Sequence, residues 1–270
     1  MGCSAVLHLA SPAGTPVFST DPLEVVGMAL GGTTSILNSA LKAGAQLRSV
    51  VLMSSAVTIS NAAANPYSEK DWNTEAEATF DKLGKQADSL TAYTAGKTAA
   101  ERAFWKFKEQ QKPAFAMTAI QGSWFIGPPL VPWKTKDDIM LSVTGIWSVM
   151  IGEDPSIPME IWEDTIDVRD VARVIVWSAL NPEKANGERF LCSSATGCRQ
   201  AIADILTKHM PEHLIQRGVP GRGYEPGYIA GKNVPQFHAV KAVRATGKDW
   251  IPYERSVLDS ARFLQRYIDS

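Results

Sequence analysis

Residues 47–56 read LRSVVLMSSA and contain the strand that decides the fold class. Its apolar run, Val50 to Met53, does not alternate with polar residues, which is typical of a parallel strand covered on both faces. Ser54 and Ser55 follow at its carboxyl end. Ligands of open parallel sheets bind beyond the carboxyl ends of strands, so these hydroxyls are candidate site residues. The simpler interpretation is that a Ser-Ser pair begins a turn.

The surrounding sequence alternates between strands and helices. We predict a strand before Ala10, the strand above, and further strands over 114–120 and 188–192. Helices are predicted over 22–43, 91–110 and 167–180, and a long polar loop with a short helix over 62–90. This β–α–β–α–β order predicts an α/β fold with a parallel sheet and helices on its faces.

The predicted helix over 91–110 begins with Tyr93-Thr94-Ala95-Gly96-Lys97, a Y-x-x-x-K pattern. Residues four apart lie on one face of a helix, so the phenol and the ammonium are neighbours. A free tyrosine has a pKa near ~10, and a nearby cation favours the phenolate and lowers that pKa. The pair therefore suits a general acid, although two solvated surface residues explain the pattern equally well.

Composition excludes several classes of function. The 270 residues include 45% hydrophobic and 20% charged residues with a formal net charge of −1, so we expect neither a nucleic-acid partner nor an anionic membrane partner. No apolar run approaches the ~18 residues of a membrane span, and the start lacks a basic signal region. Cys3, Cys192 and Cys198 have no metal-binding spacing. We expect a cytoplasmic protein without a metal.

Five short motifs follow one another along the chain. They are HLASP at 8–12, SSA at 54–56, the Y-x-x-x-K run, Gly-Pro at 127–128 and DTIDVRDVA at 164–172. Together they resemble the extended short-chain dehydrogenases/reductases. Within these, the chain is similar to the dihydroflavonol-4-reductase-like, fungal ketoreductase branch of the NAD-dependent epimerase/dehydratase family. The resemblance implies a Rossmann-like parallel sheet with a smaller C-terminal substrate lobe.

The resemblance also implies catalytic roles. Ser55 orients a substrate carbonyl, Tyr93 protonates its oxygen, and Lys97 lowers the pKa of the tyrosine and holds the nicotinamide ribose. Residues implied to contact the cofactor are Ala10, Ser11, Pro12, Tyr93, Lys97 and Gly122. Gly122 stands where the family usually has a proline, so the nicotinamide end of the site departs from the pattern.

The family's glycine-rich turn, which holds the pyrophosphate at a helix N-terminus, has no match in this chain. Glycine clusters at 27–32 and 218–223 lack the required strand–turn–helix context. Residues 1–10 resemble the fourth strand of the family, so we expect an N-terminally truncated sheet. The implied domains are a partial dinucleotide-binding domain over 1–130, to which 165–195 return, and a substrate-binding lobe over 131–164 and 196–270.

The expected activity is NAD(P)H-dependent reduction of a ketone or aldehyde in a small apolar or aromatic metabolite, in secondary metabolism. NADPH is the expected cofactor and NAD the alternative. An apolar pocket is expected to be lined by Trp124, Phe125, Trp133, Trp147 and Trp162. Packing of these residues in the core is an equal alternative. Two other functions stay open: a nucleotide-sugar epimerase or dehydratase, and a catalytically inactive remnant or interaction protein. The sequence leaves the oligomeric state undetermined.

Overall fold

The sheet is built around β2 (Ser49–Met53), whose five residues are all buried, as its uninterrupted apolar sequence requires. The computed structural model describes residues 2–12, 20–59, 66–153, 163–211, 215–230 and 237–268. β2 pairs in parallel with β1 (Ala5–His8) and with β3 (Ala116–Gly122), and β3 pairs in parallel with β6 (Arg189–Cys192). The strand order β1-β2-β3-β6 confirms the predicted α/β class with a parallel Rossmann-like sheet.

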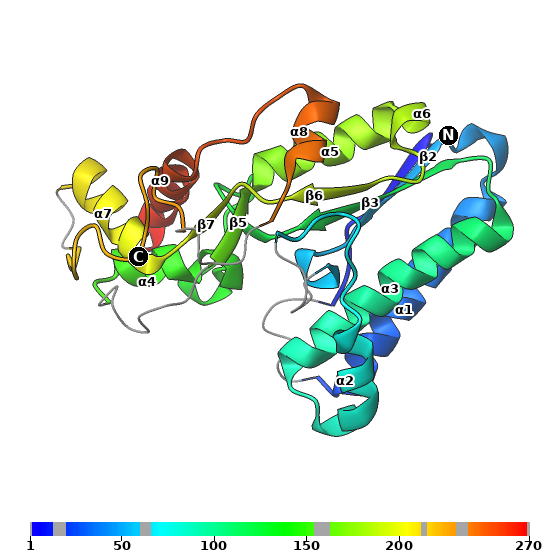
Figure 1. Cartoon of the computed structure of the whole chain (residues 1–270), viewed down its shortest axis with the longest axis horizontal. Coiled ribbons are helices and arrows are strands. Elements are labelled where there is room, and N and C mark those ends of the chain that lie inside the picture. Colours follow the sequence, from blue (N-terminus) through cyan, green and yellow to red (C-terminus); the bar gives the residue numbers. More distant parts are fainter. Residues whose placement is uncertain are drawn as a thin grey trace. The chain divides into compact units, whose positions relative to one another are not determined.

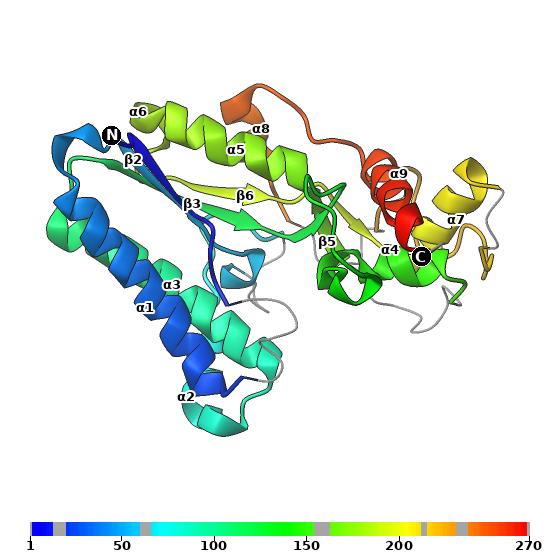
Figure 2. The ribbon, with the colours of Figure 1, turned by 180° about the vertical axis from the view of Figure 1, so that it is seen from behind.

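Helices cover both faces of this sheet (Figures 1 and 2). One face carries α1 (Pro22–Lys42) and α3 (Ser89–Gln111), with α2 (Glu75–Leu83) packed against α3. The other face carries most of α5 (Val168–Leu180), together with α6 (Pro182–Ala185) and α8 (Val240–Thr246). Short 3₁₀ helices are η2 (Gly44–Gln46), η3 (Ala56–Thr58) and η4 (Gly84–Gln86).

Local signals explain where α1 and α3 begin and end. Asp21 caps α1 by accepting a 2.9 Å bond from the backbone N–H of Leu23, and α1 stops just before Gly44, whose φ of +73° suits a glycine. Asp88 caps α3 by accepting a 2.7 Å bond from the N–H of Thr91. α3 therefore starts two residues earlier than predicted, because the cap is Asp88.

The core of the sheet lies between β2, β3 and the helices α1 and α3. Leu37 of α1 and Phe104 of α3 pack there against Val50 and Met117. α1 and α3 approach closely at Gly96, where an added Cβ would lie 3.4 Å from the Cα of Val26. Gly96 thus lies at the contact between the two helices.

The chain divides into two compact units. The first comprises 1–122, 172–192 and 238–246, and holds the four-stranded sheet. The second comprises 123–171, 193–237 and 247–270. The short helix α8 thus joins the first unit although it lies far along the sequence, because it packs on β6.

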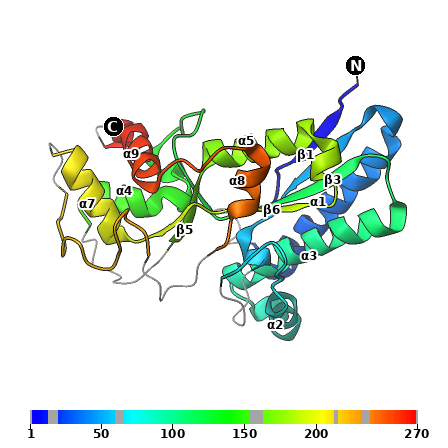
Figure 3. The same cartoon turned by 45° about the horizontal axis from the view of Figure 1, so that its top comes forward.

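The second unit has its own sheet and core. Its strands are β4 (Trp124–Ile126), β5 (Glu163–Asp167) and β7 (Ala195–Gly197), with β5 in the middle. Its helices are α4 (Thr144–Met150), α7 (Arg199–His209) and α9 (Tyr253–Leu264), which lie together in Figure 3. Its 3₁₀ helices are η5 (Lys136–Asp138), η6 (Leu141–Val143) and η7 (Gln265–Tyr267). Residues such as Val149, Leu206 and Val257 fill the core between the helices.

Candidate active site

The carboxyl end of β2 carries the two serines that follow the strand. Ser54 and Ser55 are both buried. The Ser55 hydroxyl accepts a 3.4 Å bond from the N–H of Val57 and so caps η3. The Ser-Ser pair therefore does begin a turn, as the simpler interpretation predicted. Ser55 also lies beside α3, the helix that bears Tyr93.

α3 presents four chemically distinct side chains at four-residue intervals: Tyr93, Lys97, Glu101 and Trp105. This spacing places one on each successive turn of the same helix face. The Tyr93 phenol is hydrogen-bonded to the Ser55 hydroxyl. The Lys97 ammonium is buried and donates a 2.8 Å bond to the backbone carbonyl of Met53. The structure thus brings Ser55, Tyr93 and Lys97 together at one end of β2.

Burial dominates the electrostatics of this group. Burial lowers the pKa of Lys97 to about 8, and the negative charge of Glu101 opposes that shift. Burial raises the pKa of Tyr93, and its hydrogen bond to Ser55 opposes the rise. The pKa of Tyr93 is therefore raised in the chain alone, whereas the sequence predicted a lowered value. The physical reason is that removing the phenolate from water outweighs the remaining contacts, and the ammonium bonds a carbonyl instead.

The residues expected to contact a cofactor follow neighbouring strands. Ala10, Ser11 and Pro12 come after β1, where Ala10 is exposed and the other two are half-buried. Gly122 ends β3 as a buried residue paired with Cys192. Because carboxyl ends of parallel strands share one edge, these residues lie at the edge that holds Ser55. Their contact with a cofactor stays a prediction.

His8 at the end of β1 also faces this group. Its Nε2 lies 3.3 Å from the Thr33 hydroxyl of α1. Partial burial and, to a lesser extent, the nearby charge of Lys97 lower the pKa of His8. The imidazole is therefore neutral at pH 7 and adds no second positive charge beside Lys97.

Glu101 is the functional candidate that sequence reasoning missed. Its carboxylate is fully buried and collects hydrogen bonds from three elements besides α3. The bonds come from the Ser54 hydroxyl, the Thr58 hydroxyl at 2.8 Å, Gln121 Nε2 at 2.6 Å, Trp105 Nε1 at 3.2 Å and Arg189 Nε at 2.7 Å. The available signal was its position, four residues after Lys97 on the same helix face.

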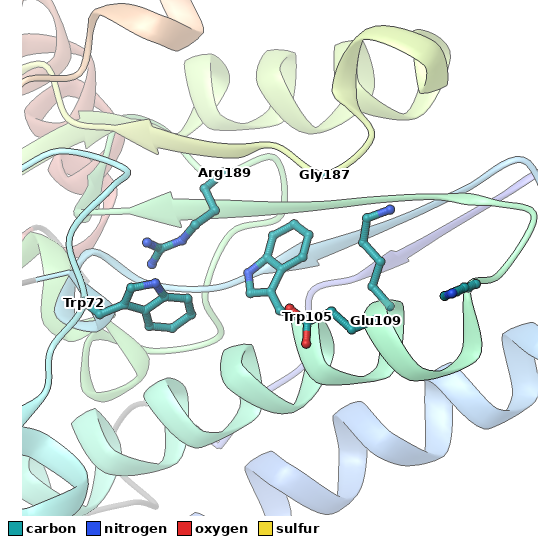
Figure 4. A pocket seen from close by; sticks show the side chains of 7 residues that line it. Trp72, Trp105, Glu109, Gly187 and Arg189 are labelled. Carbon is teal, nitrogen blue, oxygen red and sulfur yellow. The ribbon is translucent and has the colours of Figure 1, made fainter.

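Arg189 supplies the counter-charge to Glu101. It is 8% exposed, and its Nη1 donates to the backbone carbonyls of Glu69 at 2.8 Å and Asp71 at 2.7 Å. Its guanidinium lies 3.9 Å from the centre of the Trp72 ring, as Figure 4 shows. The ion pair therefore ties β6 and the segment before α2 to the middle of α3.

A cavity of about 650 Å³ lies beyond this ion pair, beside the second half of α3 (Figure 4). Its lining consists of Trp72, Trp105, Lys108, Glu109, Lys112, Gly187 and Arg189. Trp105 follows Tyr93 by twelve residues, which is ~18 Å along an α-helix. The cavity is therefore separate from the Ser55, Tyr93 and Lys97 group.

Of the five aromatic residues expected to line a pocket, two pack on the core of the second unit. Trp133 packs edge-on against Phe263 at 5.5 Å, and Trp147 packs on the core of that unit. Trp124 is 42% exposed, and Trp162 lies outside the described residues. Core packing, the alternative interpretation, is correct for Trp133 and Trp147.

The described residues hold neither a membrane-spanning helix nor a cluster of metal-binding side chains. In this part of the chain, no helix is both long and apolar enough to cross a bilayer. In the same part of the chain, His, Cys, Asp and Glu side chains form no cluster of three or more that could hold a metal ion.

Comparison with known proteins identifies the family. Residues 1–192 match the model of the NAD dependent epimerase/dehydratase family. The chain belongs to this family, in agreement with the resemblance of its motifs.

Its curated relatives include reductases. The chain is 30% identical to an NADPH-dependent methylglyoxal reductase of Saccharomyces cerevisiae, over 81% of this chain and 65% of the relative. It is 28% identical to a ketoreductase of Cercospora nicotianae, over 95% of this chain and 71% of that protein. The chain thus spans less than two thirds of the length of the methylglyoxal reductase.

A solved structure has the same fold. The crystal structure of the yeast methylglyoxal/isovaleraldehyde reductase complexed with NADPH superposes with a TM-score of 0.83 at 26% identity, covering 98% of this chain and 78% of that one. The vestitone reductase of alfalfa, at 20% identity and a TM-score of 0.71, shares the fold.

Proposed function

We propose that this protein is an NADPH-dependent reductase of ketones or aldehydes, with NAD as the alternative cofactor. The observation that carries the proposal is the cluster of Ser55, Tyr93 and Lys97 at the carboxyl end of β2. The names of the related reductases support the same chemistry. We place the cofactor on residues 1–130 and 165–195, and the substrate on residues 131–164 and 196–270.

The residues present fit the nicotinamide end of such a cofactor. A phenol, a hydroxyl and an ammonium converge beside a strand end, where Lys97 would hold the ribose and Ala10, Ser11, Pro12 and Gly122 would border the ring. In the described part of the chain, no residues form a comparable site for the pyrophosphate of the cofactor. Gly27, Gly31 and Gly32 all lie inside α1 and do not form a turn between a strand and a helix.

When bound, the reduced nicotinamide supplies a hydride to the carbonyl carbon. Tyr93 keeps its proton at neutral pH because burial raises the pKa of the phenol, and it donates that proton to the carbonyl oxygen. Ser55, hydrogen-bonded to the same phenol, orients that oxygen. Lys97 is protonated below pH 8, so its charge stabilises the phenolate that remains after the transfer.

The substrate class we propose is a small apolar or aromatic carbonyl compound, such as an intermediate of secondary metabolism, and the place of action is the cytoplasm. Methylglyoxal and isovaleraldehyde, the two compounds in the names given to the related yeast reductase, are small carbonyl compounds.

The test is NADPH consumption by the 270-residue chain at millimolar cofactor, with a series of aldehydes and ketones of increasing size. We expect turnover that Tyr93→Phe removes. A folded chain that reduces none of these compounds would contradict the proposed function and favour a non-catalytic interaction protein. Conversion of a nucleotide sugar without net NADPH consumption would instead favour an epimerase.

A further inference from the structure

Glu101 lies one helical turn beyond Lys97 and contacts the segment that bears Ser55. We propose that Glu101 is a positioning residue for the site, which holds residues 53–58 against α3 and supplies the negative charge that keeps Lys97 cationic. The kinetic test of this inference rests on the proposed function. A second test, the pKa of Lys97, can be measured on a chain that shows no catalytic activity.

The positioning argument starts from the hydrogen bonds on either side of Ser55. The residue before it, Ser54, donates its hydroxyl to the Glu101 carboxylate. Three residues after it, the Thr58 hydroxyl lies 2.8 Å from both the Glu101 carboxylate and the backbone carbonyl of Ser55. Ser55 is thus held from both sides by one carboxylate on the helix that carries Tyr93. Loss of that carboxylate frees the serine relative to the tyrosine.

The charge argument concerns the environment of Lys97. Among the described residues, the charged or titratable groups around it are His8 of β1, Tyr93 and Glu101 of its own helix, and Arg189 of β6, which pairs with Glu101. His8 is neutral at pH 7, Tyr93 is protonated, and Arg189 is positive. Glu101 is therefore the only negative charge in this set, and it favours the ammonium form that burial opposes.

Glu101 also neutralises buried Arg189. The experiment must therefore distinguish this structural role of Glu101 from its proposed role in positioning Ser55. Glu101→Gln alone leaves the guanidinium without its partner and risks unfolding. The double variant Glu101→Gln with Arg189→Met removes both charges of this ion pair together, so it tests positioning in a chain that holds no unpaired guanidinium at residue 189. Glu101→Asp keeps the charge on a shorter side chain. Glu77→Gln breaks the partly exposed pair between Glu77 of α2 and Arg102 of α3, whose charged atoms lie 2.7 Å apart, and serves as the matched control.

The experiment measures two quantities on each folded variant. The first is the pKa of Lys97, followed by NMR of isotope-labelled lysine and assigned by the signal that Lys97→Met removes. The second is kcat and KM for NADPH-dependent carbonyl reduction, across a pH series. We expect the double variant to fold, to lower the pKa of Lys97 below its value of about 8 in the parent chain, and to reduce kcat by ~10²-fold with little change in KM. Glu101→Asp should recover part of both losses, and Glu77→Gln should change neither.

Parent-like kcat and parent-like Lys97 pKa in the folded double variant would overturn the proposal, because pairing with Arg189 would then be the whole role of Glu101. If the parent chain shows no turnover at all, the proposed function fails, but the Lys97 pKa still decides the inference about Glu101. An unchanged pKa in that case overturns it, and a lowered pKa supports it.

Discussion

The Lys97 ammonium donates its 2.8 Å hydrogen bond to the carbonyl of Met53, two residues before Ser55. Through this bond the helix that bears the tyrosine holds the end of the strand that bears the serine. Lys97 therefore contributes to the geometry of the site as well as to its charge. Its substitution should therefore change both the stability of the fold and the charge beside Tyr93.

Tyr93→Phe should reduce kcat by roughly 10²–10⁴-fold, the range for loss of a general acid. Folding should change little, since the ring stays and only the hydroxyl bonded to Ser55 is lost. Steady-state kinetics and thermal unfolding measure the two effects. Tyr228→Phe, a half-buried tyrosine of the second unit, is the control. Parent-like turnover by Tyr93→Phe would show that another group donates the proton.

The free energy of unfolding of the parent chain, relative to Lys97→Met, should rise with pH above about 8. The pKa of Lys97 is about 8 in the folded chain, against the ordinary 10.5 when unfolded. Between these values the unfolded chain binds the extra proton, so stability increases with pH. The shift corresponds to at most about 3 kcal/mol. Urea unfolding of both proteins between pH 7 and pH 10 measures the difference, and a difference that falls over this range would refute the assigned pKa.

NADPH should bind the 270-residue chain weakly. The described residues contain no glycine-rich turn leading into a helix, and such a turn normally holds the pyrophosphate through backbone N–H groups. Titration monitored by NADPH fluorescence should show no saturation at micromolar cofactor. A low-micromolar dissociation constant would mean that another segment of the chain holds the pyrophosphate.

The isolated chain should self-associate through β1. This strand is at the edge of the four-stranded sheet, and Leu7 and Leu9 are 41% and 53% exposed. An edge strand with exposed apolar side chains promotes pairing between chains. Light scattering should detect oligomers at micromolar protein, and Leu7→Lys should reduce them. Leu130→Lys, at a fully exposed leucine of the second unit, is the control. A monodisperse parent monomer would contradict this prediction.

The fold was predictable because its signals are local. The unalternated strand 49–53 and the capped helix after Asp88 are each determined by residues close in sequence. The spacing of Tyr93 and Lys97 on one helix and the position of Ser55 after a strand were predictable for the same reason, because helix spacing and strand ends are also local properties.

The contacts of Glu101 were not predictable in the same way. Arg189 is 88 residues away and Ser54 is 47 residues away, so only the tertiary fold brings them together. The direction of the Tyr93 pKa shift was predicted wrongly for a related reason. Spacing reveals which charge is near a group, but it does not reveal how much water the fold removes from that group.

Gly96 lies inside the Y-x-x-x-K run, next to Lys97, and its bare Cα faces Val26 of α1. The space left at this residue, which has no functional group of its own, therefore bears on where α3 can place the proposed proton donor. A bulky side chain at this position would push the two helices apart and carry Tyr93 and Lys97 away from the end of β2, with every reactive group intact. The geometry of the proposed site thus depends on how closely two helices pack as well as on the identity of its reactive groups.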